Sequence, residues 1–283
     1  MGWEDGPLVG LDFETTGVDP KRDPPVQVAI VTTSAEGVLG EEVFLVDPER
    51  EIPEAAVAVH GITTERARRE GRSLEEAARR VHWAMAQALS EDVPVVAMNA
   101  SFDLTIAETL FRRFGLRPLD WRAVLDPLVL DRHLDRYRPG KRRLDALCEH
   151  YRVSLLQAHD AASDATAAVE LTRRIALSYP MCGRVPASRL TRLQAAWHQE
   201  WAESYDDWRR REGLDGLRRD DFFWPVRPLE GQPARRSRKA VEHGVDILLG
   251  RARVHHGYAY QRLAGVRRRH DERGAGLQKL FGP

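Results

Sequence analysis

The 283-residue sequence lacks the features that define several protein classes. Its only two cysteines, Cys148 and Cys182, have no metal-ligand spacing, so a disulfide scaffold and a zinc ribbon are excluded. It contains no run of about 18 apolar residues, which excludes a membrane-spanning helix. The acid-containing stretch 1–7 has no apolar core of a secretory signal. These absences predict a cytoplasmic protein that works without a membrane.

Lysine is also scarce, with four residues against 39 arginines, and the net charge of zero hides a segregation. Residues 1–180 hold 22 basic and 30 acidic side chains, whereas residues 181–283 hold 21 basic and 13 acidic ones. Genome composition would explain the preference for arginine but not the segregation. An acidic body with a basic end can hold a polyanion if metal ions offset the acids locally.

The hydrophobic pattern predicts an α/β fold. Three short apolar runs with short connections, 8–13, 26–33 and 42–46, predict an antiparallel meander at the start of a sheet. Strands and helices then alternate, which predicts a sheet with helices on both faces. A capping box at Ser73 and Glu76 opens the first of these helices. The later segments are expected at 73–89 (helix), 93–98 (strand), 101–114 (helix), 122–126 (strand), 127 onward (helix), 144–151 (helix) and 160–178 (helix).

A break at 179–186 divides the chain. It predicts a domain over 1–180, a Trp-rich helix over 187–212 and a basic, partly flexible tail over 213–283. Apolar residues recur along the Trp-rich helix at roughly helical spacing, which favours a packing face over a platform for stacking bases. The stripe comprises Leu190, Leu193, Trp197, Trp201, Ser204 and Trp208.

Two acids close the first predicted strand. Asp12 and Glu14 are two residues apart, so they project from the same face of the strand. Two such charges 4 Å apart repel by roughly 1–4 kcal/mol, depending on the effective dielectric. The pair therefore favours a cation held between the carboxylates, although two solvated acids at a strand end remain the alternative.

Two further segments carry acids in similar places. Asp103 follows the predicted strand 93–98, where Ser101 could instead cap a helix whose dipole Asp103 complements. His159 precedes Asp164 by five residues. Asp160 is predicted to cap the helix 160–178, which contains Asp164. Asp164 lies among alanines, which indicates a helix face that approaches its neighbour closely.

These segments, in this order, resemble the DEDDh family of 3′–5′ exonucleases, which includes the epsilon proofreading subunit of bacterial replicative polymerase, ribonuclease T and oligoribonuclease. The matching motifs are D-x-E-T-T-G at 12–17, H-G-I-T at 60–63, N-A-x-F-D at 99–103 and H-x-x-x-x-D at 159–164. Met98 stands where many relatives have histidine. The resemblance covers about residues 7–178. It implies a ribonuclease H-like mixed sheet flanked by helices, which here carries a C-terminal helical and irregular extension.

The resemblance also implies a site. Two Mg²⁺ or Mn²⁺ ions would be held by four catalytic acids, and His159 would act as the base that takes a proton from the attacking water. The acids are Asp12, Glu14, Asp103 and Asp164. The residues implied to contact the substrate are Thr15, Thr16 and Gly17 for the terminal sugar, His60 and Asn99 for the backbone, and Phe102 either for a base or for its own helix.

The sequence therefore predicts a two-metal 3′–5′ exonuclease that releases nucleoside 5′-monophosphates from nucleic acid 3′ ends, with single-stranded DNA favoured. Its partner, if any, would be a DNA polymerase or repair protein acting in trans. An exoribonuclease remains open because the same acids serve RNA, and only contacts with the 2′-OH discriminate the two. A non-enzymatic nucleic-acid-binding or polymerase-docking module also remains open.

Overall fold

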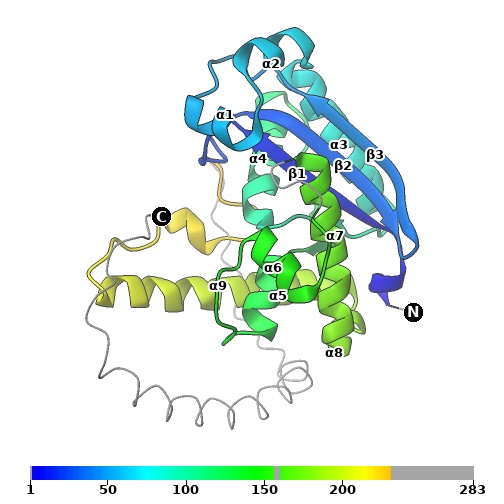
Figure 1. Cartoon of the computed structure of the whole chain (residues 1–283), viewed down its shortest axis with the longest axis vertical. Helices are drawn as coiled ribbons and strands as arrows, with labels where there is room; N and C mark the ends of the chain where they lie inside the picture. Colours follow the sequence, from blue (N-terminus) through cyan, green and yellow to red (C-terminus); the bar gives the residue numbers. More distant parts are fainter. Residues whose placement is uncertain (1, 156–159, 231–283) are drawn as a thin grey trace. The chain divides into compact units, whose positions relative to one another are not determined.

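The computed structural model describes residues 2–155 and 160–230, which contain a five-stranded mixed sheet (Figure 1). The strand order is β3-β2-β1-β4-β5; β1, β2 and β3 are antiparallel neighbours, and β4 and β5 continue the sheet parallel to β1. The predicted meander is confirmed, while the two later strands are shorter than predicted. The strands are β1 (Leu8–Thr15), β2 (Pro25–Ser34), β3 (Gly37–Leu45), β4 (Val95–Val96) and β5 (Val124–Leu125).

Helices cover both faces of this sheet. In Figure 1, α7 crosses one face over β1 and β2, and α3 and α4 lie on the other. The predicted α/β fold is thus confirmed, as is the capping box that opens α3 at Ser73 and Glu76. The helices are α1 (Glu54–His60), α2 (Thr64–Glu70), α3 (Leu74–Ser90), α4 (Ala100–Arg113), α5 (Pro127–Leu134), α6 (Leu144–Tyr151), α7 (Ala161–Ser178), α8 (Pro180–Gly183) and α9 (Ala187–Arg211), with 3-10 turns η1 (Trp3–Asp5) and η2 (Arg219–Phe222).

Small residues allow α7 to lie directly on β1. A side chain at Gly10 would come within 2.9 Å of the Ala165 carbonyl oxygen. Ala161 and Ala165 are buried together with two residues of β2, Ala29 and Val31. The close approach predicted from the alanines around Asp164 is therefore confirmed, and it places α7 on the face of β1 that carries its alternate residues from Gly10 onward.

The helix α9 changes character along its length. Leu190, Leu193 and Trp197 are buried, so the predicted packing face is confirmed for the first half. Beyond them the rings of Trp201, Tyr205 and Trp208 stack on one another, with centroids 5.2 and 5.5 Å apart. Trp208 is 43% exposed, so the packing face does not extend to the end of the helix.

Residues 214–230, which we call the strap, follow α9 and pack against the body. Phe223, Trp224 and Leu229 of the strap are buried. The indole Nε1 of Trp224 donates a hydrogen bond of 3.0 Å to the Asp126 carboxylate, and the backbone N–H of Arg227 donates one of 2.9 Å to the Thr105 hydroxyl in α4. This part of the predicted tail is therefore joined to the sheet domain by hydrogen bonds as well as by apolar contacts.

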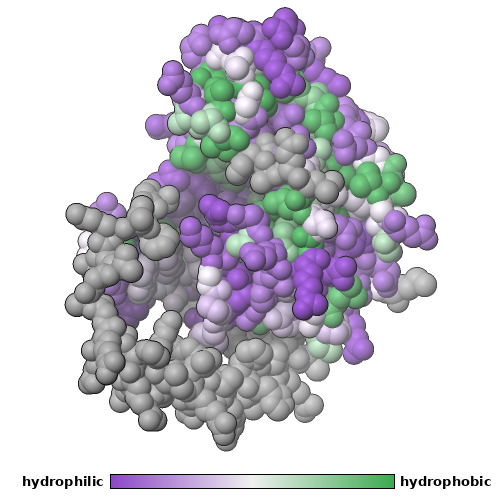
Figure 2. All heavy atoms as spheres, in the orientation of Figure 1, coloured by the Kyte–Doolittle hydropathy of each residue, from purple (hydrophilic) through white to green (hydrophobic). Residues whose placement is uncertain are grey.

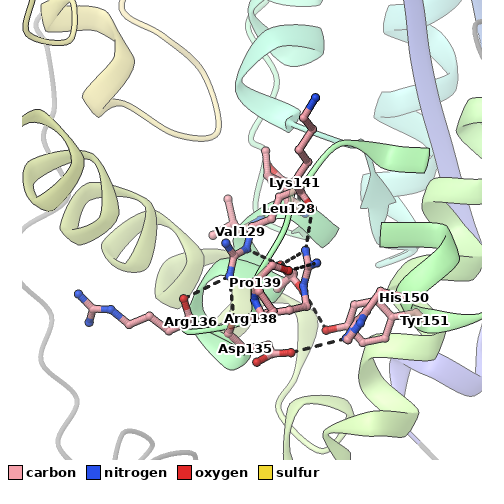
Figure 3. A network of polar contacts seen from close by, with 12 residues as sticks. Leu128, Val129, Asp135, Arg136, Arg138, Pro139, Lys141, His150 and Tyr151 are labelled. Carbon is pink, nitrogen blue, oxygen red and sulfur yellow. Dashed lines mark hydrogen bonds and ion pairs between the residues drawn. The ribbon is translucent and has the colours of Figure 1, made fainter. Parts of the chain in front are cut away.

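A network of charged groups fills the space between α5, α6 and the loop that joins them (Figure 3). Its centre is Asp131 of α5, which is fully buried and accepts hydrogen bonds from Arg138, Arg142 and Tyr151 at 2.7–3.3 Å. Arg138 also donates to the carbonyl oxygens of Pro139 and Lys141. The chain thus supplies this buried carboxylate with two guanidinium partners of its own.

The face of the molecule in Figure 2 is mostly hydrophilic, and hydrophobic residues form separate groups on it. Within the described ranges, no helix is long and apolar enough to cross a membrane.

Candidate active site

The site begins at the end of β1. Asp12 and Glu14 lie on the face of β1 that α7 covers, and both are half-buried. The turn that follows is held by a hydrogen bond of 2.6 Å from the Thr15 hydroxyl to the Gly17 carbonyl oxygen. Thr16 is buried, and its hydroxyl has no hydrogen-bond partner among the described residues. A buried hydroxyl without a partner is unusual in a folded protein, so the Thr16 hydroxyl is available to hydrogen-bond a ligand.

Asp103 reaches the same strand from α4. It lies in the first turn of that helix and is 4% exposed. One of its carboxylate oxygens accepts a hydrogen bond of 3.2 Å from the backbone N–H of Phe13, which stands between Asp12 and Glu14. The start of α4 is therefore fastened to the strand position that separates the two acids.

The start of α4 is capped from another part of the chain. Asp126, which follows β5, accepts hydrogen bonds from the backbone N–H groups of Asn99 and Ala100 at 3.1 and 2.9 Å. The alternative that Ser101 caps this helix is wrong, because Ser101 is buried inside its first turn. Asp126 takes over the capping role since its carboxylate reaches two free amides at once. The sequence showed Asp126 only as the residue before Pro127.

The third segment brings Asp164 and a further acid. Asp160 is the N-cap of α7, as predicted, and accepts from the Ser163 N–H at 3.1 Å. Asp164 lies one turn further along, half-buried and hydrogen-bonded through its backbone N–H to the Asp160 carbonyl oxygen. His159, the predicted base, lies outside the described residues. Asp160 was predicted only as a cap, but its charge also acts on the acids of β1.

These carboxylates repel one another. Burial, followed by the charges of Asp103, Glu14, Asp164 and Asp160, raises the pKa of Asp12 well above its ordinary value. Burial and the charges of Asp164 and Asp160 raise the pKa of Glu14 to about 7. Burial likewise raises the pKa of Asp103, although the hydrogen bond from Phe13 opposes the shift. We call Asp12, Glu14, Asp103 and Asp164 the acid cluster. Among the described residues, the charged groups that contribute most to the shift of the Asp12 pKa are all acids.

The donor set of the acid cluster fits hard divalent cations. Four carboxylates from three segments offer only oxygen ligands, which Mg²⁺ and Mn²⁺ prefer. Within residues 2–155 and 160–230, no three His, Cys, Asp or Glu side chains stand close enough to form a metal-binding group as they are. Like charges keep their distance without a counter-charge, so these side chains would have to draw together around an ion.

The remaining predicted contact residues lie at the end of α1, at the start of α4 and in the turn after β1. His60 ends α1, where its Nδ1 accepts a hydrogen bond of 3.1 Å from the Ile62 N–H. Asn99 precedes α4 with a φ of 62°, a left-handed conformation that asparagine tolerates better than most residues. Phe102 is half-buried and is not part of the buried core. The last predicted contact, Gly17, packs against the Asp23 carboxylate, which occupies the space that a side chain at Gly17 would need.

Comparisons with known proteins match the same part of the chain. A DNA polymerase III PolC-type protein of Thermotoga maritima is 29% identical over 193 residues, which cover 67% of this chain and 13% of that protein. The DNA polymerase III subunit epsilon of Rickettsia conorii is 29% identical over 171 residues, covering 57% of this chain and 70% of that protein. The zinc-bound complex of E. coli exonuclease I with single-stranded DNA matches with a TM-score of 0.54 and 26% identity, covering 62% of this chain and 41% of that chain. The chain thus spans only a small part of the PolC-type relative and less than half of exonuclease I.

A family comparison defines the extent of the shared domain. The model of the RNase_T family, described as exonuclease, matches residues 9–172, which are more than half of the chain. The match runs from β1 into α7 and so includes all three segments that supply the acid cluster. As the resemblance of its motifs predicted, the chain belongs to the RNase_T exonuclease family.

Proposed function

We propose that this chain is a 3′–5′ exonuclease that uses two Mg²⁺ or Mn²⁺ ions to release nucleoside 5′-monophosphates from single-stranded DNA. The observation that carries this proposal is the acid cluster, because its carboxylates come from three segments, offer only oxygen ligands and raise the pKa of Asp12 and Glu14. Among the described residues, the charged groups that contribute most to the shift of Asp12 are all acids. In this proposal residues 1–180 hold the hydrolytic site, and the helix 187–212 and the segment 213–283 form an extension.

Each residue of the site has a role in this reaction. Bound divalent ions would supply activation of water and stabilise charge on the attacking and leaving oxygens. Asp12, Glu14, Asp103 and Asp164 would hold them. The Thr16 hydroxyl, which is buried without a partner among the described residues, would donate to the terminal sugar together with Thr15 and the backbone of Gly17. His159 would accept the proton of the attacking water, a role that suits a side chain with an ordinary pKa near 6.5.

The choice of DNA follows from the relatives. Two of them are named as DNA polymerase III proteins, and the exonuclease I complex contains single-stranded DNA. These names favour DNA as substrate and proofreading or repair as the setting, with a polymerase or repair protein as partner in trans. His60, Asn99 and Phe102 would contact the strand next to the terminal nucleotide.

The proposal is tested by digesting 5′-labelled single-stranded DNA and RNA of the same sequence side by side. With Mg²⁺ or Mn²⁺ we expect a descending ladder on DNA that shortens from the 3′ end, and with chelator no cleavage. An Asp12→Asn variant is the matched control, because it keeps the side-chain shape and removes one charged ligand. It should not cleave either strand. A ladder on RNA alone would make the protein an exoribonuclease. Binding of the strand without cleavage under all conditions would favour a binding or docking module and overturn the proposal.

A further inference from the structure

A cavity of about 710 Å³ opens between the strap, α4 and the loop that follows β1. We call it the arginine groove, because six basic side chains but only three acidic ones line it. Its basic residues are Lys21, Arg22, Arg112, Arg113, Arg218 and Arg227, and its acidic ones are Asp19, Asp220 and Glu230. The groove is therefore a positively charged surface on a body whose first 180 residues are acidic overall.

Some of these charges hold the walls together. Lys21 of the loop pairs with Asp220 of the strap, and Arg227 pairs with Asp221 at 3.2 Å. Arg22, Arg112 and Arg218 are exposed and come from the loop, α4 and the strap in turn. Arg112 also donates to the Glu230 carbonyl oxygen, and Arg218 lies 3.5 Å from the Asp221 carboxylate. Each wall nevertheless presents at least one exposed guanidinium to solvent.

One buried donor of the groove has no acceptor. The Arg227 side chain is 13% exposed, and its Nε has no hydrogen-bond partner within the described part of the chain. A buried guanidinium donor normally has a partner, and oxygen atoms of phosphate or carboxylate match its geometry. The Nε is enclosed, so Arg227 contributes to the groove through its positive charge rather than through this donor.

Two elements of the chain extend from the acid cluster to the groove. The loop that begins at Gly17 lines the groove from Asp19 to Arg22, and the Asp23 carboxylate accepts from the Asp19 N–H at 2.8 Å and fills the space above Gly17. The helix α4 carries Asp103 in its first turn and Arg112 near its end. The strap is fastened to this helix at Thr105, two residues after Asp103.

We propose that the arginine groove binds the phosphates of the nucleic-acid strand on the 5′ side of the scissile bond. This inference rests on the proposed exonuclease function, and it assigns the strap a part in holding the substrate. Arginine side chains from three walls contact successive phosphates, and the affinity they supply does not depend on base sequence. A strand held there keeps its 3′ end at the acid cluster between successive cleavages.

The test compares two substrates in the presence of Mg²⁺. A dinucleotide has only the scissile phosphate, whereas a 15-nucleotide strand also has phosphates that can enter the groove. In the triple variant Arg22→Gln, Arg112→Gln and Arg218→Gln, we expect the KM for the long strand to rise about tenfold or more at 50 mM salt. At 200 mM salt the rise should be smaller, because salt already weakens the phosphate contacts of the wild type. The slope of log affinity against log salt should become shallower by about 2, since each lost contact to a single strand removes about 0.7. The kcat/KM for the dinucleotide should not change.

A second triple variant, Arg79→Gln, Arg143→Gln and Arg211→Gln, is the matched control, because it removes three exposed arginines that do not line the groove. It should behave as the wild type on both substrates. Equal effects of the groove variant and this control on the long strand, or no effect of either, would overturn the assignment of the groove. Absence of hydrolysis of both substrates by the wild type would instead contradict the proposed function, so the two failures are distinguishable.

Discussion

The carboxylates of Asp131 and Asp12 are fully buried and half-buried, respectively, and the charges around them have opposite signs. Asp131 is fully buried and receives hydrogen bonds from two arginines and a tyrosine. Asp12 lies among acids that raise its pKa. A buried carboxylate persists where its charge is balanced. The described residues supply that balance to Asp131, whereas for Asp12 the proposed function assigns it to a bound cation.

The comparison contrasts residues that maintain the fold with residues that, in the proposed function, hold the metal ions. Removing one partner of the Asp131 network leaves charged groups buried without a counter-charge. Removing one acid of the cluster relieves a repulsion. The two regions should therefore respond to substitution in opposite directions, and this contrast can be tested.

The largest effect is expected from Asp12→Asn. If Asp12 holds an ion, this change should lower kcat at least about 100-fold, because even the outer partners of metal ligands are typically worth 10–100-fold. The melting temperature measured in chelator should stay the same or rise, since one repelling charge is gone. Asp164→Ala should also abolish turnover with little loss of fold. Near-normal turnover of either variant would remove that residue from the ligand set.

A change at His159 sharpens the comparison within the site. His159→Ala should lower kcat by about 10²–10⁴-fold, the usual contribution of a general base. The rise of the melting temperature with Mg²⁺ should remain as in the wild type, because a base is not a ligand. If the variant also loses the response to Mg²⁺, His159 is a ligand instead.

The opposite response is expected from Asp131→Ala. Breaking a buried ion pair leaves Arg138 and Arg142 without their carboxylate, which should reduce the free energy of unfolding by about 3–5 kcal/mol. Urea denaturation measures this loss, and Mg²⁺ should not restore it. The control Glu75→Ala breaks an exposed pair with Arg79 and should cost less than about 1 kcal/mol. Equal stability of the Asp131 and Glu75 variants would show that the Asp131 network does not stabilise the fold more than an exposed ion pair.

The smallest effect is the dependence of metal stabilisation on pH. The raised pKa of Glu14 means that the folded chain holds a proton that the unfolded chain releases, so its contribution to stability is present below pH 4.5 and is lost as the pH rises through about 7. If Glu14 is a ligand, as proposed, Mg²⁺ competes with that proton. Saturating Mg²⁺ should therefore raise the melting temperature more at pH 8 than at pH 5.5; at 100 times Kd the gain is about 2.7 kcal/mol. A shift that is the same at both pH values would contradict this account.

Much of the fold was predictable because it depends on local patterns. Short apolar runs with short connections predicted the three antiparallel strands, and Ser73 with Glu76 predicted the start of α3. The helices α1 and α2 were not predicted, since they have seven residues each and too few buried positions to show a period. The strands β4 and β5 are short because each has only two residues in register with its neighbour.

The candidate site was predictable in part, because its acids also lie in local sequence motifs. Motif spacing identified Asp12, Glu14 and Asp103. In the structure the charges of Glu14 and Asp103 raise the pKa of Asp12. The capping of α4 by Asp126 and the attachment of the strap at Trp224 depend on contacts between residues far apart in the sequence. No local pattern predicts such contacts, because the residues next to each partner in the sequence do not depend on the contact.

The position of Asp126 has a consequence for how far the working unit extends. Its backbone N–H donates to Gln194 in α9 and its carboxylate accepts from Trp224 in the strap, while the same carboxylate orients the first turn that carries Asp103. A fragment ending at residue 172 would retain Asp12, Glu14, Asp103 and Asp164 yet lack both Gln194 and Trp224. Anyone who shortens this protein, or grafts its nuclease onto another chain, should keep residues through 230 so that this support is preserved.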